Sequence, residues 1–138
     1  MIIVIICLVC FNMSNAQTTK TMDSLSMKYQ QVLDTGKDMF GSTRLYDLQI
    51  DRMLNVVYNR LLHTCNLNQR QNLKTEEQNW IKKRDAYFRR TMNKMLRTSR
   101  RESSIARDED MMRLNDNSEF VKKRVLFLLK RTNNNYSF

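Results

Sequence analysis

Proline is absent from this 138-residue sequence, and glycine occurs only twice. Folds made of many short β-strands need tight turns, and tight turns depend heavily on these two residues. The shortage therefore argues against a β-sandwich or a β-barrel. The composition is instead rich in Met, Leu, Lys, Arg, Asn and Gln, most of which tolerate or favour helix. We expect a single all-α domain, which also suits the length.

Histidine is almost missing as well, since His63 is the only one. A Ser-His-Asp or Cys-His site would have to use it, and no strand–turn–helix pattern surrounds it. His63 lies off the apolar face of its expected helix and does not share a face with Cys65, so the two make a poor metal pair. No glycine-rich phosphate loop is present. We therefore predict no enzyme activity, no catalytic residue, no metal site and no cofactor.

The N-terminus has no charged side chain. Residues 1–11 are apolar, and Ser14-Asn15-Ala16 is a small-x-small site, which together predict a signal peptide over 1–16 with cleavage after Ala16. Either the amino terminus supplies the positive charge that usually precedes such a run, or the true start lies upstream. The run is shorter than the roughly 20 residues of a membrane-spanning helix. We expect a periplasmic or secreted protein with no transmembrane helix after cleavage.

Few cysteines would remain after export, because Cys7 and Cys10 leave with the signal. Bulky Ile6 and Val9 precede these two cysteines, which argues against a lipoprotein anchor. Mature Cys65 is then alone, so an intramolecular disulfide is excluded and the core must hold the domain together. A thiol buried near a helix end is the expected arrangement, with a dimer disulfide as the alternative.

Acidic residues are outnumbered, with 14 Asp and Glu against 24 Lys and Arg and a net charge of +10. The imbalance is local, because residues 82–101 are strongly basic whereas residues 108–119 are mainly acidic. A positive field favours acidic proteins, nucleic acids or anionic envelope polymers as partners. Solvation of outer helix faces is the plainer explanation of the same charges.

Apolar periodicity predicts two helices in the first half of the mature chain. An N-terminal segment, 17–42, contains a weak helix over residues 23–40. Ser42 or Thr43 can cap the next helix. Residues 44–64 then form a strong helix, with an apolar face at i, i+3, i+4 spacing.

Asn68, followed by Gln71 as in a capping box, predicts the start of another helix that ends near residue 97. The connection is short, so residues 44–97 should form an antiparallel helical hairpin. Trp80 would then lie near Met53 and Leu54 of the other helix.

The remainder of the chain predicts one further helix. Residues 98–117 are polar and indicate a loop or a frayed helix end with a short helical turn. A C-terminal helix over 118–131 should pack on the hairpin, which completes a small helical bundle over 43–131. Residues 132–138 are expected to form a mobile tail.

A helical count separates the aromatic and basic residues that follow Trp80. Trp80, Arg84, Tyr87 and Phe88 fall on one apolar face. Trp80 is then either a core residue that fastens the hairpin or an exposed anchor for a partner. The opposite face carries the candidate binding residues, which are Lys82, Lys83, Arg89, Arg90, Lys94 and Arg97.

Two arginines lie inside predicted apolar faces, where they must be paired or reach water. For Arg84 we predict an ion pair with Asp47 or Asp51 across the hairpin. For Arg124 the predicted partner is Glu77.

The chain resembles the family of the lysozyme inhibitor LprI over roughly residues 43–130. The likeness is carried by Leu54-Asn55-x-x-Tyr58-x-x-Leu61, Leu73-Lys74, Trp80-x-x-x-Arg84-Asp85-Ala86 and Val121-x-x-Arg124. It implies a small exported domain in which these positions form a structural motif: Leu54, Asn55, Tyr58, Leu61, Leu73, Trp80, Arg84, Asp85 and Arg124. Two cysteines of the family pattern correspond to Phe88 and about Ser42, so the disulfide that they imply is missing.

Two functions follow as hypotheses. The first is an exported protein-binding module, such as a lysozyme-inhibitor-like or envelope-associated protein. The alternative is a basic module that holds anionic envelope polymers through its six candidate residues. A strongly basic lysozyme would repel this chain unless residues 108–119 or the face of Asp47 and Asp51 supplied an acidic patch. Nucleic acid is disfavoured, because the charged face has no base-stacking aromatics.

Overall fold

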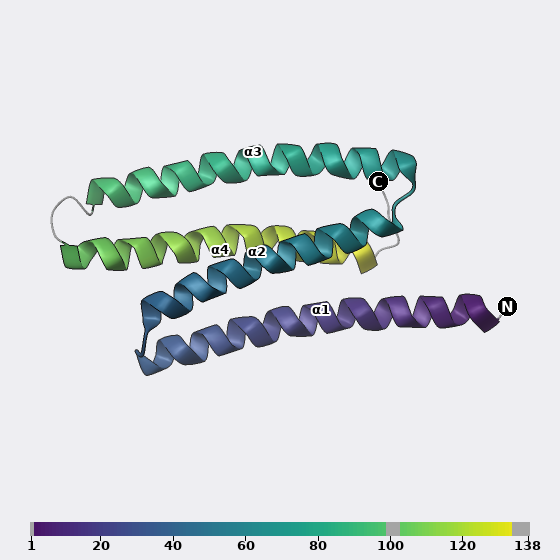
Figure 1. Ribbon diagram of the computed structural model, residues 1–138, viewed down its shortest axis with the longest axis horizontal. Coiled ribbons are helices and arrows are strands. Elements are labelled where there is room, and N and C mark those ends of the chain that lie inside the picture. The colour runs from purple at the N-terminus through teal and green to yellow at the C-terminus, as the bar shows by residue number, and fades with distance from the viewer. Residues whose placement is uncertain (1, 99–102, 134–138) are drawn as a thin grey trace.

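The residues that the structure describes form four helices: α1 (Ile2–Thr35), α2 (Met39–Thr64), α3 (Leu67–Thr98) and α4 (Ser103–Asn133) (Figure 1). The computed structural model describes the backbone of residues 2–98 and 103–133, and the side chains of residues 19–98 and 106–132. The described ranges contain helix and no strand. The predicted all-α class is therefore confirmed, with four helices in place of a hairpin and a third helix.

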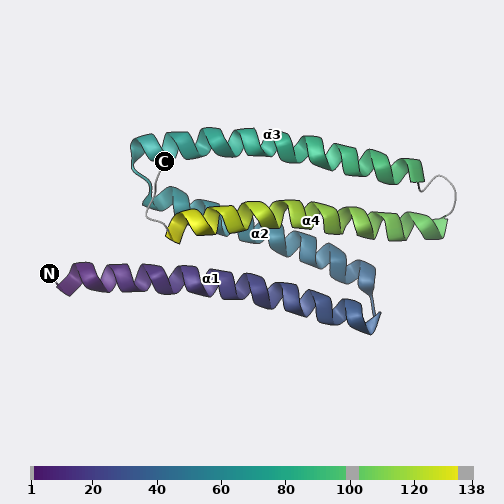
Figure 2. The ribbon, with the colours of Figure 1, turned by 180° about the vertical axis from the view of Figure 1, so that it is seen from behind.

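Helix α4 lies centrally and packs on both α2 and α3, while α1 packs on α2 and also touches α4 (Figures 1 and 2). Helices α2 and α3 are joined by a tight connection but diverge from it. The prediction that they pack on each other as a hairpin is wrong. The physical reason for this difference is that both helices pack their apolar faces on α4. Val121 and Val125 of α4 belong to the core shared with α2, and Phe120 of α4 stacks on Trp80 of α3.

The core forms chiefly between α2 and α4. Helix α2 contributes the predicted apolar face, with Tyr46, Ile50, Leu54, Val57 and Leu61 buried. Single buried residues, Met22 of α1 and Leu73 of α3, complete it. Burial of such side chains stabilises the fold by roughly 1.5–3 kcal/mol each.

The helix caps differ from those predicted. Gly36 and Asp38 adopt positive φ angles of 65° and 43°, so α1 ends there and α2 starts at Met39. The Asp38 carboxylate caps α2 by accepting a hydrogen bond from Gly41 N at 3.2 Å. A cap at Ser42 or Thr43 is therefore wrong, because the chain had already turned at the glycine.

The capping box of α3 begins two residues before the predicted position. Asn66 Oδ1 accepts from Gln69 N at 2.9 Å, and Gln69 Oε1 accepts from Asn66 N at 3.0 Å. The sequence offers the same Asn-x-x-Gln spacing at residues 66 and 68, and the pattern alone does not choose between them.

The segment expected to be a loop is mostly helix, because α4 begins at Ser103 rather than at 118. Two polar residues at the boundary between the expected loop and the expected helix, Asn117 and Ser118, are buried and hydrogen-bonded to distant partners. Ser118 donates to Asp47 at 2.9 Å, and Asn117 accepts from Thr91 at 3.0 Å. At the other end Thr132 is buried within α4, and residues 134–138 of the predicted tail lie outside the described residues.

The predicted signal region belongs to α1, whose helical backbone extends from Ile2. No helix of the described ranges is both long enough and apolar enough to cross a membrane. Cleavage after Ala16 stays a prediction.

Candidate binding surface on helices α3 and α4

Helix α3 displays most of its surface to solvent, since it buries only Leu73 and Glu77. The six candidate residues of its basic face, Lys82, Lys83, Arg89, Arg90, Lys94 and Arg97, are all exposed. Within the described parts of the chain, none of them forms an ion pair with a carboxylate. Their charges are therefore available to a partner, and their role in binding stays a prediction.

Beside the basic face lies an aromatic seam between α3 and α4, which we define as Trp80, Tyr87 and Phe120. Phe120 stacks on Trp80 with ring centroids 6.0 Å apart and on Tyr87 at 4.5 Å. All three side chains are half-buried. Trp80 therefore stacks on Phe120 of α4 and packs against the core that α2 and α4 form. It belongs to a partly open aromatic surface between α3 and α4.

Arg84 lies over this seam and not against α2. Its guanidinium carbon is 5.7 Å from the ring centroids of both Trp80 and Phe88. It donates to Asp85 Oδ1 from Nε at 3.0 Å and from Nη2 at 2.8 Å. The predicted pair with Asp47 or Asp51 is wrong, because α2 diverges from α3 and Asp47 is engaged by Ser118.

A buried ion-pair network joins α3 to α4 next to the seam. Arg124 donates to Glu77 Oε2 from Nε at 3.1 Å and from Nη2 at 2.7 Å, which confirms the predicted pair. Arg124 Nη1 also donates to Glu76 Oε1 at 2.6 Å, and Arg131 pairs with the other oxygen of Glu76. Glu76 and Arg131 could also have been predicted from the sequence, since Arg131 lies two helical turns after Arg124 and Glu76 precedes Glu77.

Some of the acidic residues named as a possible acidic patch are partly buried or paired. Burial raises the pKa of the Asp47 carboxyl above its usual range, although the hydrogen bond from Ser118 opposes the shift. In the predicted acidic stretch, Asp110 pairs with Arg113 at 2.6 Å and Glu119 with Lys122 at 3.3 Å. The candidate surface therefore consists of the basic face of α3 and the aromatic seam. Burial raises the pKa of the Tyr87 hydroxyl group, and the exposed Asp116 is close enough to raise it further.

Nucleophilic and metal-binding chemistry finds no support in the described parts of the chain. His63 is exposed, as predicted. Cys65 is 6% exposed at the C-cap of α2, which confirms the expected burial near a helix end. That burial raises the pKa of its thiol, which disfavours the reactive thiolate. No group of three metal-ligating side chains occurs among the described residues.

The Glu76 carboxylate should make stability depend on acidity. Burial opposes its ionisation, but hydrogen bonds from Arg131 and Arg124 outweigh burial and lower its pKa below the ordinary 4.5. A carboxyl with a depressed folded-state pKa stabilises the fold above its unfolded pKa, and this contribution is lost as pH falls. We therefore expect the free energy of unfolding to decrease below about pH 4.5. Urea titrations at several pH values measure this, and Glu76→Gln should flatten the dependence; an unchanged slope in that variant would contradict the assignment.

Comparison with known proteins identifies the family. The chain matches the family model described as "Lysozyme inhibitor LprI" over residues 41–125. Searches of curated proteins and of solved structures found no match. The matched range starts in α2, includes all of α3 and ends within α4, so it contains both the aromatic seam and Arg124. Since it covers more than half of the sequence, this lysozyme-inhibitor-like chain belongs to the LprI lysozyme inhibitor family.

Proposed function

We propose that the protein is an exported, non-catalytic module that binds a lysozyme-class hydrolase and occludes its active-site cleft. The observation that carries the proposal is the half-open aromatic seam with Arg84 over it. Tryptophan, tyrosine and arginine are the residues that most often dominate the energy of protein interfaces. Family membership supplies the class of partner, and the seam supplies a surface that can anchor it.

The charge of α3 suits such a cleft. Glycoside hydrolases of this kind carry a pair of carboxyl groups at the scissile bond. The basic face beside the seam attracts a cleft lined by carboxylates, and it repels proteins with a strongly positive surface. We therefore infer that the natural target is a lysozyme with a neutral or acidic surface around its cleft.

The first test measures inhibition of a panel of lysozymes of differing net charge by the exported protein. The substitution Trp80→Ala should weaken inhibition of the target by about 30-fold, which corresponds to an interface hot spot of roughly 2 kcal/mol. The matched control is Leu48→Ala, because Leu48 is an apolar residue of α2 that is 57% exposed and lies outside the seam. Circular dichroism verifies that both variants are folded. Equal inhibition by both variants, or no inhibition of any lysozyme, would contradict the proposal.

A second candidate function rests on the six exposed cations of α3. For a basic module that holds anionic envelope polymers, the logarithm of the binding constant should fall linearly with the logarithm of the salt concentration, because binding releases counterions. Replacing Lys82 and Lys83 by glutamine would reduce that slope. Salt-insensitive binding to one protein partner would exclude this alternative.

Export is tested separately. The mass of the protein recovered from the cell envelope shows whether residues 1–16 are removed.

A further inference from the structure

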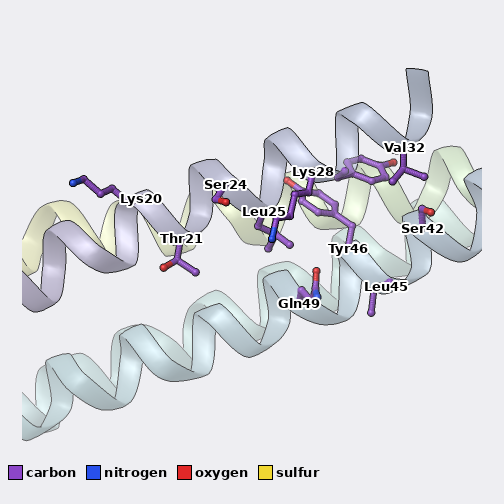
Figure 3. A pocket seen from close by; sticks show the side chains of 11 residues that line it. Lys20, Thr21, Ser24, Leu25, Lys28, Val32, Ser42, Leu45, Tyr46 and Gln49 are labelled. Atoms are coloured by element: carbon purple, nitrogen blue, oxygen red, sulfur yellow. The ribbon is translucent and has the colours of Figure 1, made fainter. Parts of the chain in front are cut away.

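Helices α1 and α2 lie side by side on the edge of the molecule away from α3 (Figures 1 and 2), and residues of both line a groove. It consists of two adjoining hollows of about 550 and 370 Å³ that share Thr21, Leu25 and Gln49. Figure 3 shows the larger hollow, where Thr21 of α1 and Gln49 of α2 point into the gap from opposite sides. Volumes in this range are typical of small-molecule sites.

The lining of the groove is largely apolar. Tyr29 and Tyr46, which line the larger hollow, stack with ring centroids 4.2 Å apart. Their hydroxyl groups are already hydrogen-bonded, Tyr29 to Thr43 at 3.0 Å and Tyr46 to Ser26 at 3.2 Å. The two rings therefore offer mainly carbon surface to the groove. Further apolar side chains along it are Leu25, Val32, Leu45, Met53 and Val56.

The charged residues of the lining all have one sign. Lys20 and Lys28 come from α1, and Arg52 and Arg60 come from α2. No aspartate or glutamate belongs to the described lining of either hollow. An apolar trough bordered only by cations is complementary to a ligand with an apolar body and a negative head.

We propose that this groove binds a single-chain anionic amphiphile of the fatty-acid class. The acyl chain lies between α1 and α2, and the carboxylate is held by the lysines and arginines at the border. Residues 20–32 of α1, which flank the larger hollow, extend over about 18 Å of helix, so an extended chain can lie along them. An acidic amphipathic helix fits less well, because its diameter is about 10–12 Å and the stacked tyrosines hold α1 against α2.

The site is independent of the lysozyme-binding proposal, since none of its residues belongs to α3 or α4. The test uses calorimetric titration of the exported protein with laurate below its micelle concentration. We expect saturable binding of one laurate per chain. Neutral monolaurin and cationic dodecyltrimethylammonium, which carry the same chain, should bind at least about tenfold more weakly if the border charges select the head group.

Two variants locate the ligand. Combined Lys28→Glu and Arg52→Glu should weaken laurate binding by at least about tenfold, whereas the matched charge reversal Lys82→Glu and Lys83→Glu on α3 should change it less than about twofold. Ser24→Trp, which fills the trough with an indole, should abolish binding while the circular dichroism spectrum is retained. Equal affinity for all three head groups, no saturable laurate binding, equal effects of the two charge reversals, or preferential binding of an acidic helical peptide would each overturn the proposal.

Discussion

Replacement of Arg124 by methionine is expected to lower the free energy of unfolding by about 3–5 kcal/mol, because it leaves a buried carboxylate without its partner. Arg124 and Glu77 are 7% and 8% exposed, so water cannot replace the lost guanidinium. Domains of this kind are stable by about 5–15 kcal/mol. The substitution therefore removes a large part of the total, and urea denaturation followed by circular dichroism measures it.

The neighbouring residue provides a matched control. Lys123 is an exposed cation on the same helix, so Lys123→Met should change stability by less than about 0.5 kcal/mol. Adding Glu77→Gln to Arg124→Met should recover much of the loss, since the destabilisation comes from the unpaired charge and not from the missing bridge itself. A loss below about 1 kcal/mol in the single variant would show that water reaches Glu77 and that the network is not sealed.

The same ion pair shows how far the sequence could lead. Arg124 and Glu77 each interrupt an apolar helical face, and a buried charge must be paired. The need for pairing selects Glu77 as the partner of Arg124. It does so equally if α4 packs on a hairpin of α2 and α3 or directly on α3. The buried face of α2 was likewise predictable, because its five core residues follow the helical repeat without interruption.

Predictions that depended on which helices touch were less successful. Arg84 was assigned a partner on α2, but its position relative to α2 depends on α4, whose first half was mistaken for a loop. The mistake has a physical cause. Asn117 and Ser118 look like solvated polar residues, yet they are buried because their hydrogen-bond partners lie 26 and 71 residues away. Polarity indicates a loop only when such distant partners are missing.

The α1–α2 groove was missed for a related reason. The helix over residues 23–40 shows only a broken apolar pattern, which a sequence count scores as weak. In the structure Leu25 and Val32 of this helix line the groove. Leu45 and Val56 of α2 line it too and are 56% and 44% exposed. Periodicity detects a buried face, but it does not distinguish a covered face from one that is still open.

The second large effect is expected in the core of α4. Leu128 is fully buried among the residues that α4 packs against α2. Leu128→Ala removes that apolar contact and leaves a cavity, so the free energy of unfolding should fall by about 2–5 kcal/mol. Chemical denaturation of the two proteins under identical conditions measures the difference.

Leu126 is a close control for this substitution, because the same side chain on the same helix is 42% exposed. Leu126→Ala alters helix propensity equally but makes no cavity, so its effect should stay within about 0.5 kcal/mol. Similar losses from both variants would mean that α4 does not present one face to α2.

The comparison also bears on function, because Leu128 lies outside the aromatic seam. Leu128→Ala should lower the fraction of folded protein, while the affinity of the folded molecules for a lysozyme stays unchanged. Trp80→Ala should instead weaken binding by the molecules that remain folded, in addition to the stability that is lost with its stack on Phe120.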